Sequence, residues 1–350
     1  MEQNIKKIRV NASSSYDVII GNDLLKDSGK IISSVLPKCK IALITDDIVD
    51  GLYANKVSSS LEKQGFAVSK FVFPHGEESK NLATYGQILN FLAENEFTRT
   101  DAVVALGGGV VGDMAGFASA TFLRGIKYVQ IPTTLLAQID SSVGGKTAID
   151  LESGKNLVGA FCQPAVVICD VSLIESLPLD TFIDGMGELT KYAVLDKKIF
   201  EEISNPIIDM ETLIYLSIDY KKMIVEQDEF EGGTRRLLNL GHTPAHGIER
   251  LSEYKISHGR AVAYGLEIIV NASLKHGYLG QNQADKILQI VNKCTEARSE
   301  EMSFSIEDIA SACLTDKKRS GDDITLIMVY GIGDCRPYKI KVKDLKEYLS

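Results

Sequence analysis

The chain contains 350 residues, of which 45% are apolar and 24% are charged, so it can bury a sizeable core and is expected to be globular. At about 150 residues per domain, this length predicts two domains. The net charge of −9 disfavours a nucleic-acid partner, because such proteins normally carry a basic stripe. No apolar stretch approaches the ~18 residues of a membrane span, and the N-terminus lacks a signal-peptide pattern, so we expect no membrane partner.

The six cysteines lie scattered along the chain without any C-x-x-C pair. This distribution predicts reduced, buried thiols in a cytoplasmic protein. We therefore expect no disulfide framework.

The first half of the chain alternates strand-like runs with helical stretches. Residues 5–10 and 16–20 flank a polar turn and predict an antiparallel pair added at the edge of a sheet. Apolar or β-branched runs predict five further strands, at 41–45, 66–73, 102–106, 127–131 and 165–169. Several of these runs do not alternate, as expected for parallel strands covered on both faces. With helical stretches at 51–64 and 80–95 between them, they predict βαβ units.

Beyond residue 176 the pattern becomes helical. The stretches 208–229, 261–277 and 283–297 repeat apolar residues with helical spacing, and strand-like runs almost vanish. We therefore predict an α/β domain over residues 1–175 and a mainly helical domain over residues 176–350. A cleft between two such domains is the natural place for a functional site.

A glycine cluster follows the strand predicted at 102–106 and opens a predicted helix at Met114. Gly107, Gly109 and Gly112 satisfy the pattern G-x-G-x-x-G. Clustered glycines let backbone N–H groups approach a pyrophosphate at a helix N-terminus. No strand-ending acid follows about 20 residues later, unlike the ordinary dinucleotide fingerprint, so a structural turn is the alternative.

Two charged features precede the glycine cluster. Asp46, at the end of the strand predicted at 41–45, is placed either to bind a ribose diol or to cap a helix. Glu77 and Lys80 lie in a charged loop between a predicted strand and a predicted helix, and this loop alone does not distinguish a binding role from a solvated surface.

Gly145, Lys146 and Thr147 imitate the end of a P-loop. Asp140 stands where that loop needs its first glycine, and its carboxylate would repel a phosphate, so we reject the P-loop interpretation. The sequence also lacks the G-x-S-x-G elbow of a serine hydrolase.

Three of the five histidines, His242, His246 and His258, lie close together in the sequence. Pro244 suits the first position of a helix with Thr243 as its N-cap, which places His242 just outside this helix and His246 just inside it. The two rings then need not share a face. His258 likewise precedes a predicted helix.

Glu188 is the candidate for a third ligand beside two of these histidines. Two imidazoles, one carboxylate and an open position form a familiar catalytic zinc arrangement, although structural histidines are the alternative. Lys191 follows Glu188 by three residues and shares its helix face. The pair is either a surface ion pair or one wall of a cleft.

Further basic residues lie in glycine-rich or turn settings. They are Arg124, Lys146, Lys155 and Arg235. Each alone is more typical of solvated surface, but together they favour an anionic substrate that carries phosphate or carboxylate.

Several sequence blocks resemble the 3-dehydroquinate synthase family. The block GGGVVGDMAGFASATFLRGIKYVQIPTTLLAQIDSSVGGKTAIDLESGKNLVGAF is similar to the signature of this family without a gap. GELTKYAVL, LLNLGHTPAHGIE, SHGRAVAYG and DKKRSG are similar to its later blocks in the same order. One departure concerns the second histidine of G-H-T-x-G-H-A, since this chain has Ala245 before His246 and Gly247 after it.

The resemblance implies an N-terminal Rossmann-like, parallel-sheet domain that binds NAD, a helical C-terminal metal and substrate domain, and a homodimer. It implies zinc or cobalt held by Glu188, His242 and His258. The implied catalytic or substrate contacts are Arg124, Asp140, Lys146, Lys155, Asn156, Lys191, Arg235, Asn239, His246 and Lys317. The implied NAD contacts are Asp46, Glu77, Lys80, Gly108, Gly109, Val110, Val111, Gly112, Asp113, Thr133, Thr134, Lys146, Lys155, Leu173 and Ser176.

The implied activity is a lyase reaction of the shikimate pathway, which leads to aromatic amino acids. A seven-carbon keto-acid sugar phosphate is transiently oxidised by NAD, loses phosphate, is reduced again and closes into a carbocycle. A metal-dependent polyol or glycerol dehydrogenase, another sugar-phosphate cyclase and a catalytically silent NAD-binding regulator are the alternatives.

Overall fold

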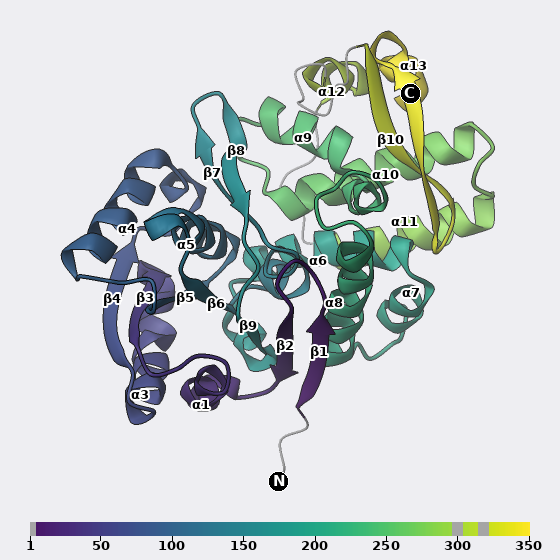
Figure 1. Cartoon of the computed structure of the whole chain (residues 1–350). Coiled ribbons are helices and arrows are strands. Elements are labelled where there is room, and N and C mark those ends of the chain that lie inside the picture. The colour runs from purple at the N-terminus through teal and green to yellow at the C-terminus, as the bar shows by residue number, and fades with distance from the viewer. Residues whose placement is uncertain (1–4, 296–303, 314–321) are drawn as a thin grey trace. The chain divides into compact units, whose positions relative to one another are not determined.

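The computed structural model describes residues 5–295, 304–313 and 322–350 (Figure 1). Contacts within the chain divide it into two compact units. Unit 1 comprises Met1–Leu177 and Lys221–Glu229, and unit 2 comprises Pro178–Tyr220 and Phe230–Ser350.

Unit 1 is built on a seven-stranded sheet with the strand order β1-β2-β9-β6-β5-β3-β4. Its strands are β1 (Lys6–Val10), β2 (Tyr16–Gly21), β3 (Lys40–Asp46), β4 (Ala67–Phe73), β5 (Ala102–Gly107), β6 (Lys127–Pro132) and β9 (Val166–Asp170). β1 pairs with β2 in antiparallel orientation, and the other neighbours pair in parallel. The predicted parallel sheet with an antiparallel pair at its edge is confirmed.

Helices cover both faces of this sheet (Figure 1). They are α1 (Ser28–Ser33), α2 (Asp47–Val49), α3 (Asn55–Lys63), α4 (Leu82–Glu94) and α5 (Gly109–Thr121). Successive residues of β3 show the two layers, because Leu43 packs in the cluster that includes Leu61 of α3, while Ile44 packs in the cluster that includes Met114 of α5. This double coverage explains why the strand is apolar without alternation.

A hairpin that the sequence analysis missed also belongs to unit 1. β7 (Lys146–Leu151) pairs with β8 (Gly154–Phe161) in antiparallel orientation. Most of β8 is exposed or half-buried, so no apolar run marks it in the sequence. Gly144 and Gly145 precede the hairpin with φ of +95° and +70°, values that favour glycine.

Unit 2 is mainly helical, as predicted. Its helices are α6 (Leu179–Leu195), α7 (Lys197–Ile203), α9 (His242–Leu251), α10 (His258–Lys275), α11 (Gln281–Thr295), α12 (Ile306–Cys313) and α13 (Leu345–Leu349). α8 (Met210–Gln227) contributes its residues up to Tyr220 to unit 2 and the rest to unit 1. Ile248 of α9 and Val262 of α10 lie in one apolar core.

The expectation that strand-like runs almost vanish beyond residue 176 is wrong near the C-terminus. β10 (Asp323–Gly331) and β11 (Asp334–Lys341) form an antiparallel hairpin (Figure 1). Leu326 and Met328 of β10 are buried in the same core as α10. β11 carries Pro337 and mostly exposed or half-buried residues, a composition typical of an edge strand, so hydrophobicity alone does not reveal it. Within the described residues, no helix has the length and apolarity that crossing a membrane requires.

Candidate metal centre and glycine loop

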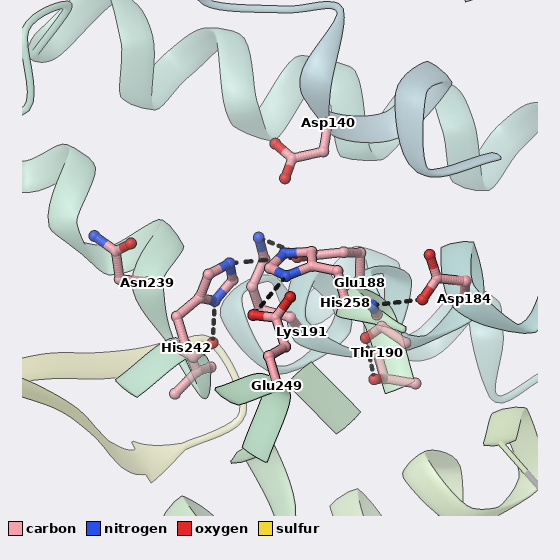
Figure 2. A network of polar contacts seen from close by, with 12 residues as sticks. Asp140, Asp184, Glu188, Thr190, Lys191, Asn239, His242, Glu249 and His258 are labelled. Atoms are coloured by element: carbon pink, nitrogen blue, oxygen red, sulfur yellow. Dashed lines mark hydrogen bonds and ion pairs between the residues drawn. The ribbon is translucent and has the colours of Figure 1, made fainter. Parts of the chain in front are cut away.

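Unit 2 brings together the three residues that the sequence analysis selected as metal ligands. Glu188 lies on α6, and His242 and His258 are the first residues of α9 and α10. One ligand atom from each lies within 4.8 Å of the other two. Glu188 Oε1 lies 3.3 Å from His242 Nε2 and 3.1 Å from His258 Nε2 (Figure 2). Residues far apart in the chain therefore present their donor atoms to one point.

Both histidine rings have the orientation of metal ligands. Each Nε2 faces Glu188, while each Nδ1 faces an acceptor outside the cluster. His242 Nδ1 lies 3.1 Å from the Leu240 carbonyl oxygen, and His258 Nδ1 lies 3.4 Å from Glu249 Oε2 (Figure 2). An imidazole that donates from one nitrogen to such an acceptor keeps a lone pair on the other for a metal. Two imidazoles and a carboxylate fit the donor set of a catalytic zinc ion.

Glu188 and Lys191 form a buried ion pair. Lys191 Nζ lies 2.6 Å from Glu188 Oε2, and both side chains are almost completely buried, so the surface ion pair considered from the sequence is wrong. Burial alone would raise the pKa of Glu188, but the charge of Lys191 and the neighbouring His242 and His258 hold it well below its usual range. The carboxylate is thus ionised and able to bind a cation.

The start of α9 differs from the prediction. Gly241, with φ of +77°, precedes a helix that begins at His242, so Thr243 is not the N-cap. Pro244 still lies in the first turn, where a backbone N–H would have no partner within the helix. His242 and His246 therefore lie four residues apart on one helix face, with ring centroids 5.8 Å apart.

Glycines set the close approach of the helices that carry the three candidate ligands. A Cβ on Gly259, next to His258, would lie 1.7 Å from the Asp184 carbonyl oxygen of α6. A Cβ on Gly265 of α10 would lie 2.1 Å from the carbonyl oxygen of Gly241, next to His242. Asp184 Oδ1 also accepts a hydrogen bond of 2.6 Å from the backbone N–H of Gly259 (Figure 2). These backbone contacts fix the positions of the first turns of α9 and α10, which carry His242 and His258.

The glycine loop of unit 1 lies between β5 and α5. α5 begins at Gly109, five residues earlier than predicted, because Gly109–Gly112 already form its first turn. The backbone N–H of Thr133 donates to the Gly107 carbonyl oxygen, and a Cβ on Gly108 would lie 3.1 Å from Thr134 Cγ2. The loop and the end of β6 therefore lie together at a helix N-terminus, the setting that favours an anion.

Three further predicted residues of unit 1 form one cluster around the buried Lys80. Lys80 Nζ lies 2.6 Å from Asp113 Oδ2 and donates over 2.6 Å to Asn156 Oδ1. Burial raises the pKa of Asp113 and outweighs the attraction of Lys80, with a further contribution from the negative charge of Glu77. Asp150 accepts from the backbone N–H of Asn156 and so holds the β7–β8 turn beside Lys80.

Two family models cover the chain one after the other. The model for the N-terminal part of 3-dehydroquinate synthase matches residues 70–184, and the model for its C-terminal part matches residues 185–319. The chain belongs to the 3-dehydroquinate synthase family. A 3-dehydroquinate synthase of Streptococcus thermophilus is 42% identical over 98% of this chain and 99% of that protein. One of Clostridium acetobutylicum is 41% identical over 96% of each.

Solved structures of related enzymes share the fold. A 2-deoxy-scyllo-inosose synthase, complexed with carbaglucose-6-phosphate, NAD+ and Co2+, has a TM-score of 0.86 at 24% identity and covers 98% of this chain and 99% of that one. A 2-epi-5-epi-valiolone synthase of Streptomyces hygroscopicus, with NAD+ and Zn2+ bound, has a TM-score of 0.83 at 20% identity and covers 98% of both chains. A glycerol dehydrogenase of Schizosaccharomyces pombe has a TM-score of 0.64 at 15% identity, covering 100% of this chain and 91% of that one.

The departure of this 3-dehydroquinate synthase family member around His246 has a packing reason. A Cβ on Gly247 would lie 2.9 Å from the Ile309 carbonyl oxygen and 3.0 Å from Cys313 Sγ, both on α12. Glycine at this position therefore lets α12 pack directly on α9. Ala245 is fully buried in the core of unit 2.

The remaining predicted residues occupy varied settings. Asp46 caps α2 by accepting a hydrogen bond from the Val49 N–H, in agreement with the alternative of a helix cap. Burial raises the pKa of Asp46. Arg235 is buried in a short helix that ends at Asn239, and Asn239 donates to Glu231 over 2.7 Å. The others in described segments lie in strands or in short helices: Arg124, Lys146, Lys155, Leu173 and Ser176. Lys317 lies outside the described residues.

Three residues near the predicted sites were not predicted from the sequence. Lys221 on α8 is buried and forms an ion pair with Asp140. A lysine in a predicted helix is normally solvated, so the sequence did not indicate this role. Glu231, the partner of Asn239, has φ of +63° in a segment next to two glycines. Glu249 follows His242 by two helical turns, and that spacing could have placed it on the ligand face.

Proposed function

We propose that this chain catalyses the reaction of its family, in which 3-deoxy-D-arabino-heptulosonate 7-phosphate becomes 3-dehydroquinate and phosphate. The substrate class is a phosphorylated seven-carbon keto-acid sugar, and the enzyme is a carbon–oxygen lyase of the shikimate pathway. The observation that carries the proposal is the convergence of Glu188, His242 and His258 in a chain whose two halves match the two family models.

We assign a divalent cation to this triad and NAD to unit 1. The donor set suits both Zn2+ and Co2+, and the two cyclases with similar folds contain one or the other together with NAD+. The N-terminus of α5, with Gly108 and Gly109, would hold the pyrophosphate. Lys80 and Asp113 would bind beside it. When bound, the metal lowers the pKa of a substrate hydroxyl, and NAD takes up a hydride and returns it.

The residues of unit 2 bind and orient the substrate in this proposal. Lys191 places an ammonium group beside the ligand cluster, where it can bind a substrate oxygen. Buried Arg235 supplies a guanidinium group that matches a carboxylate or a phosphate in two hydrogen bonds. Asn239 adds an amide for a hydroxyl, and His246, on the face of His242, can hold or move a proton.

The residues of unit 1 neutralise and position negative charge. Lys146 and Lys155 lie on the β7–β8 hairpin, and Asn156 lies beside Lys80. Together with Arg124 they would balance the phosphate that leaves and orient the substrate hydroxyls. A cytoplasmic location and a homodimer remain predictions.

One assay distinguishes this activity from its alternatives. With NAD+, Zn2+ and 3-deoxy-D-arabino-heptulosonate 7-phosphate, we expect continuous release of phosphate without lasting NADH absorbance. NADH accumulation on a polyol would instead indicate a dehydrogenase, turnover of another sugar phosphate alone would indicate a different cyclase, and no turnover would favour the regulator. The TM-score of 0.64 for glycerol dehydrogenase, against 0.86 for a cyclase, favours the cyclase outcome.

His258→Ala tests the ligand assignment within the same assay. We expect loss of bound metal and of turnover, while circular dichroism and NAD+ affinity stay unchanged. Full retention of metal by this variant would contradict the assigned ligand set.

A further inference from the structure

The two candidate ligand histidines differ in what holds the nitrogen that faces away from the cluster. His242 Nδ1 faces a backbone carbonyl oxygen, that of Leu240, at 3.1 Å. His258 Nδ1 faces a side chain, the Glu249 carboxylate, at 3.4 Å (Figure 2). The His242 side chain is 11% exposed, whereas that of His258 is 34% exposed. More of the His258 side chain is open to solvent, so the orientation of its ring depends more on its polar partner.

Glu249 is built into the same helix that supplies a ligand. It follows His242 by seven residues, or about two turns of α9, so both side chains point from one face. Its residue exposure is 3%, and its backbone carbonyl accepts a hydrogen bond of 2.7 Å from Tyr254 at the end of the helix. A buried carboxylate is costly unless it is paired, and the pairing with His258 offsets that cost.

We propose that Glu249 is a positioning residue of the metal centre: its carboxylate accepts the Nδ1 proton of His258 and thereby directs the Nε2 lone pair toward the metal. This inference rests on the proposed function, since it concerns the same triad. The hydrogen bond selects one imidazole tautomer, fixes the plane of the ring and increases the basicity of the ligand. Leu240 performs the same task for His242 through its backbone, where no substitution can remove the acceptor.

Three variants of the full-length protein separate positioning from simple structural support. Glu249→Ala removes the acceptor, and Glu249→Gln keeps an oxygen that can accept from Nδ1 but removes the charge. Glu253→Gln is the matched control, because its carboxylate is 81% exposed and lies close in sequence. The probe is Co2+ alone, followed by its visible absorption during titration and by competition with a chelator.

We expect Glu249→Ala to weaken Co2+ binding about 10- to 100-fold and to change the absorption bands of bound Co2+. Glu249→Gln should lose less affinity than Glu249→Ala, and Glu253→Gln should match the unmodified chain. NAD+ affinity should not change in any variant. A purely structural carboxylate would reduce the stability of the protein but leave the Co2+ spectrum and affinity of the folded molecules unchanged.

The outcomes also separate this inference from the proposed function. If the unmodified chain binds Co2+ and both Glu249 variants bind it with the same affinity and spectrum, the positioning role is wrong while the proposed activity stands. If the unmodified chain binds no Co2+, the metal assignment fails and the role of Glu249 fails with it. Should Glu249→Ala not fold, the spectrum and affinity of Glu249→Gln against Glu253→Gln decide.

Discussion

A buried lysine–carboxylate pair of the predicted site in unit 1 and one in unit 2 have the same length but different electrostatic environments. Lys80 and Asp113 lie 2.6 Å apart in unit 1, and Lys191 and Glu188 lie 2.6 Å apart in unit 2. Burial raises the pKa of Asp113 in spite of Lys80. The pKa of Glu188 is well below its usual range, although its side chain is more deeply buried.

The groups around each carboxylate explain this difference. Asp113 is paired with Lys80 and feels a weaker attraction from Lys221, but it also feels the negative charge of Glu77. Glu188 has Lys191 and also the two imidazoles of His242 and His258. A buried ion pair is therefore not in itself a sign of a metal site. What distinguishes unit 2 is that two imidazole nitrogens face Oε1 of Glu188, a donor set that suits a divalent cation.

Removing the two lysines separately is the strongest test of this comparison. Without metal, Lys80→Met and Lys191→Met should each reduce the free energy of unfolding by about 3–5 kcal/mol, because each leaves a buried carboxylate without its cation. Saturating Zn2+ should reduce the loss in Lys191→Met, because a bound cation replaces the missing ammonium beside Glu188. It should not reduce the loss in Lys80→Met. Urea unfolding with EDTA or Zn2+ measures all four values.

Lys80→Arg and Lys191→Arg serve as controls that keep the positive charge and should lose less stability than the methionine variants. An equal effect of Zn2+ on the losses in Lys80→Met and Lys191→Met would contradict the distinction between the two pairs.

The fold was predictable where local patterns carry the information. The buried strand β5 is apolar along its whole length, and the glycine cluster after it marks a strand–helix turn. The hairpin strands β8 and β11 were not predictable, because their exposed residues give no apolar run. Pro244 suggested that α9 starts after His242. The helix starts at His242 instead, because Gly241 before it adopts a left-handed conformation.

The candidate metal centre was only partly predictable for a different reason. Residue type and the family resemblance selected Glu188, His242 and His258, but the contact that positions α10 on α6 joins Gly259 to Asp184, which lie far apart in the sequence. A single sequence contains no signal for such a contact, because glycine has many other uses. The pairing of His258 with Glu249 likewise appears only when α9 and α10 are packed together.

Gly259→Ala tests how precisely the backbone must approach in unit 2. The new Cβ would lie 1.7 Å from the Asp184 carbonyl oxygen, so α6 and α10 must separate. We expect a loss of about 1–3 kcal/mol in the free energy of unfolding, together with weaker Co2+ binding. Gly86→Ala on α4 is the control, since its Cβ meets nothing within 4 Å and alanine should stabilise that helix by about 0.4–1 kcal/mol. Unchanged Co2+ affinity in Gly259→Ala would refute the importance of this approach.

Asp101 provides the smallest and most specific test of what decides the pKa of a buried carboxyl group. Burial opposes its ionisation as it does for Asp113, yet N–H groups of Thr98 and Lys40 lower its pKa. A carboxyl group whose pKa is lower in the folded state stabilises the protein above its unfolded pKa of about 3.9, and this contribution is lost as the pH falls through the folded value. Asp101→Asn should therefore reduce stability at pH 7 by about 1 kcal/mol and flatten its decline in acid. Urea unfolding between pH 3 and 7 measures both effects. If the free energy of unfolding of Asp101→Asn declines in acid as steeply as that of the unmodified chain, the hydrogen-bond donors do not outweigh burial at this site.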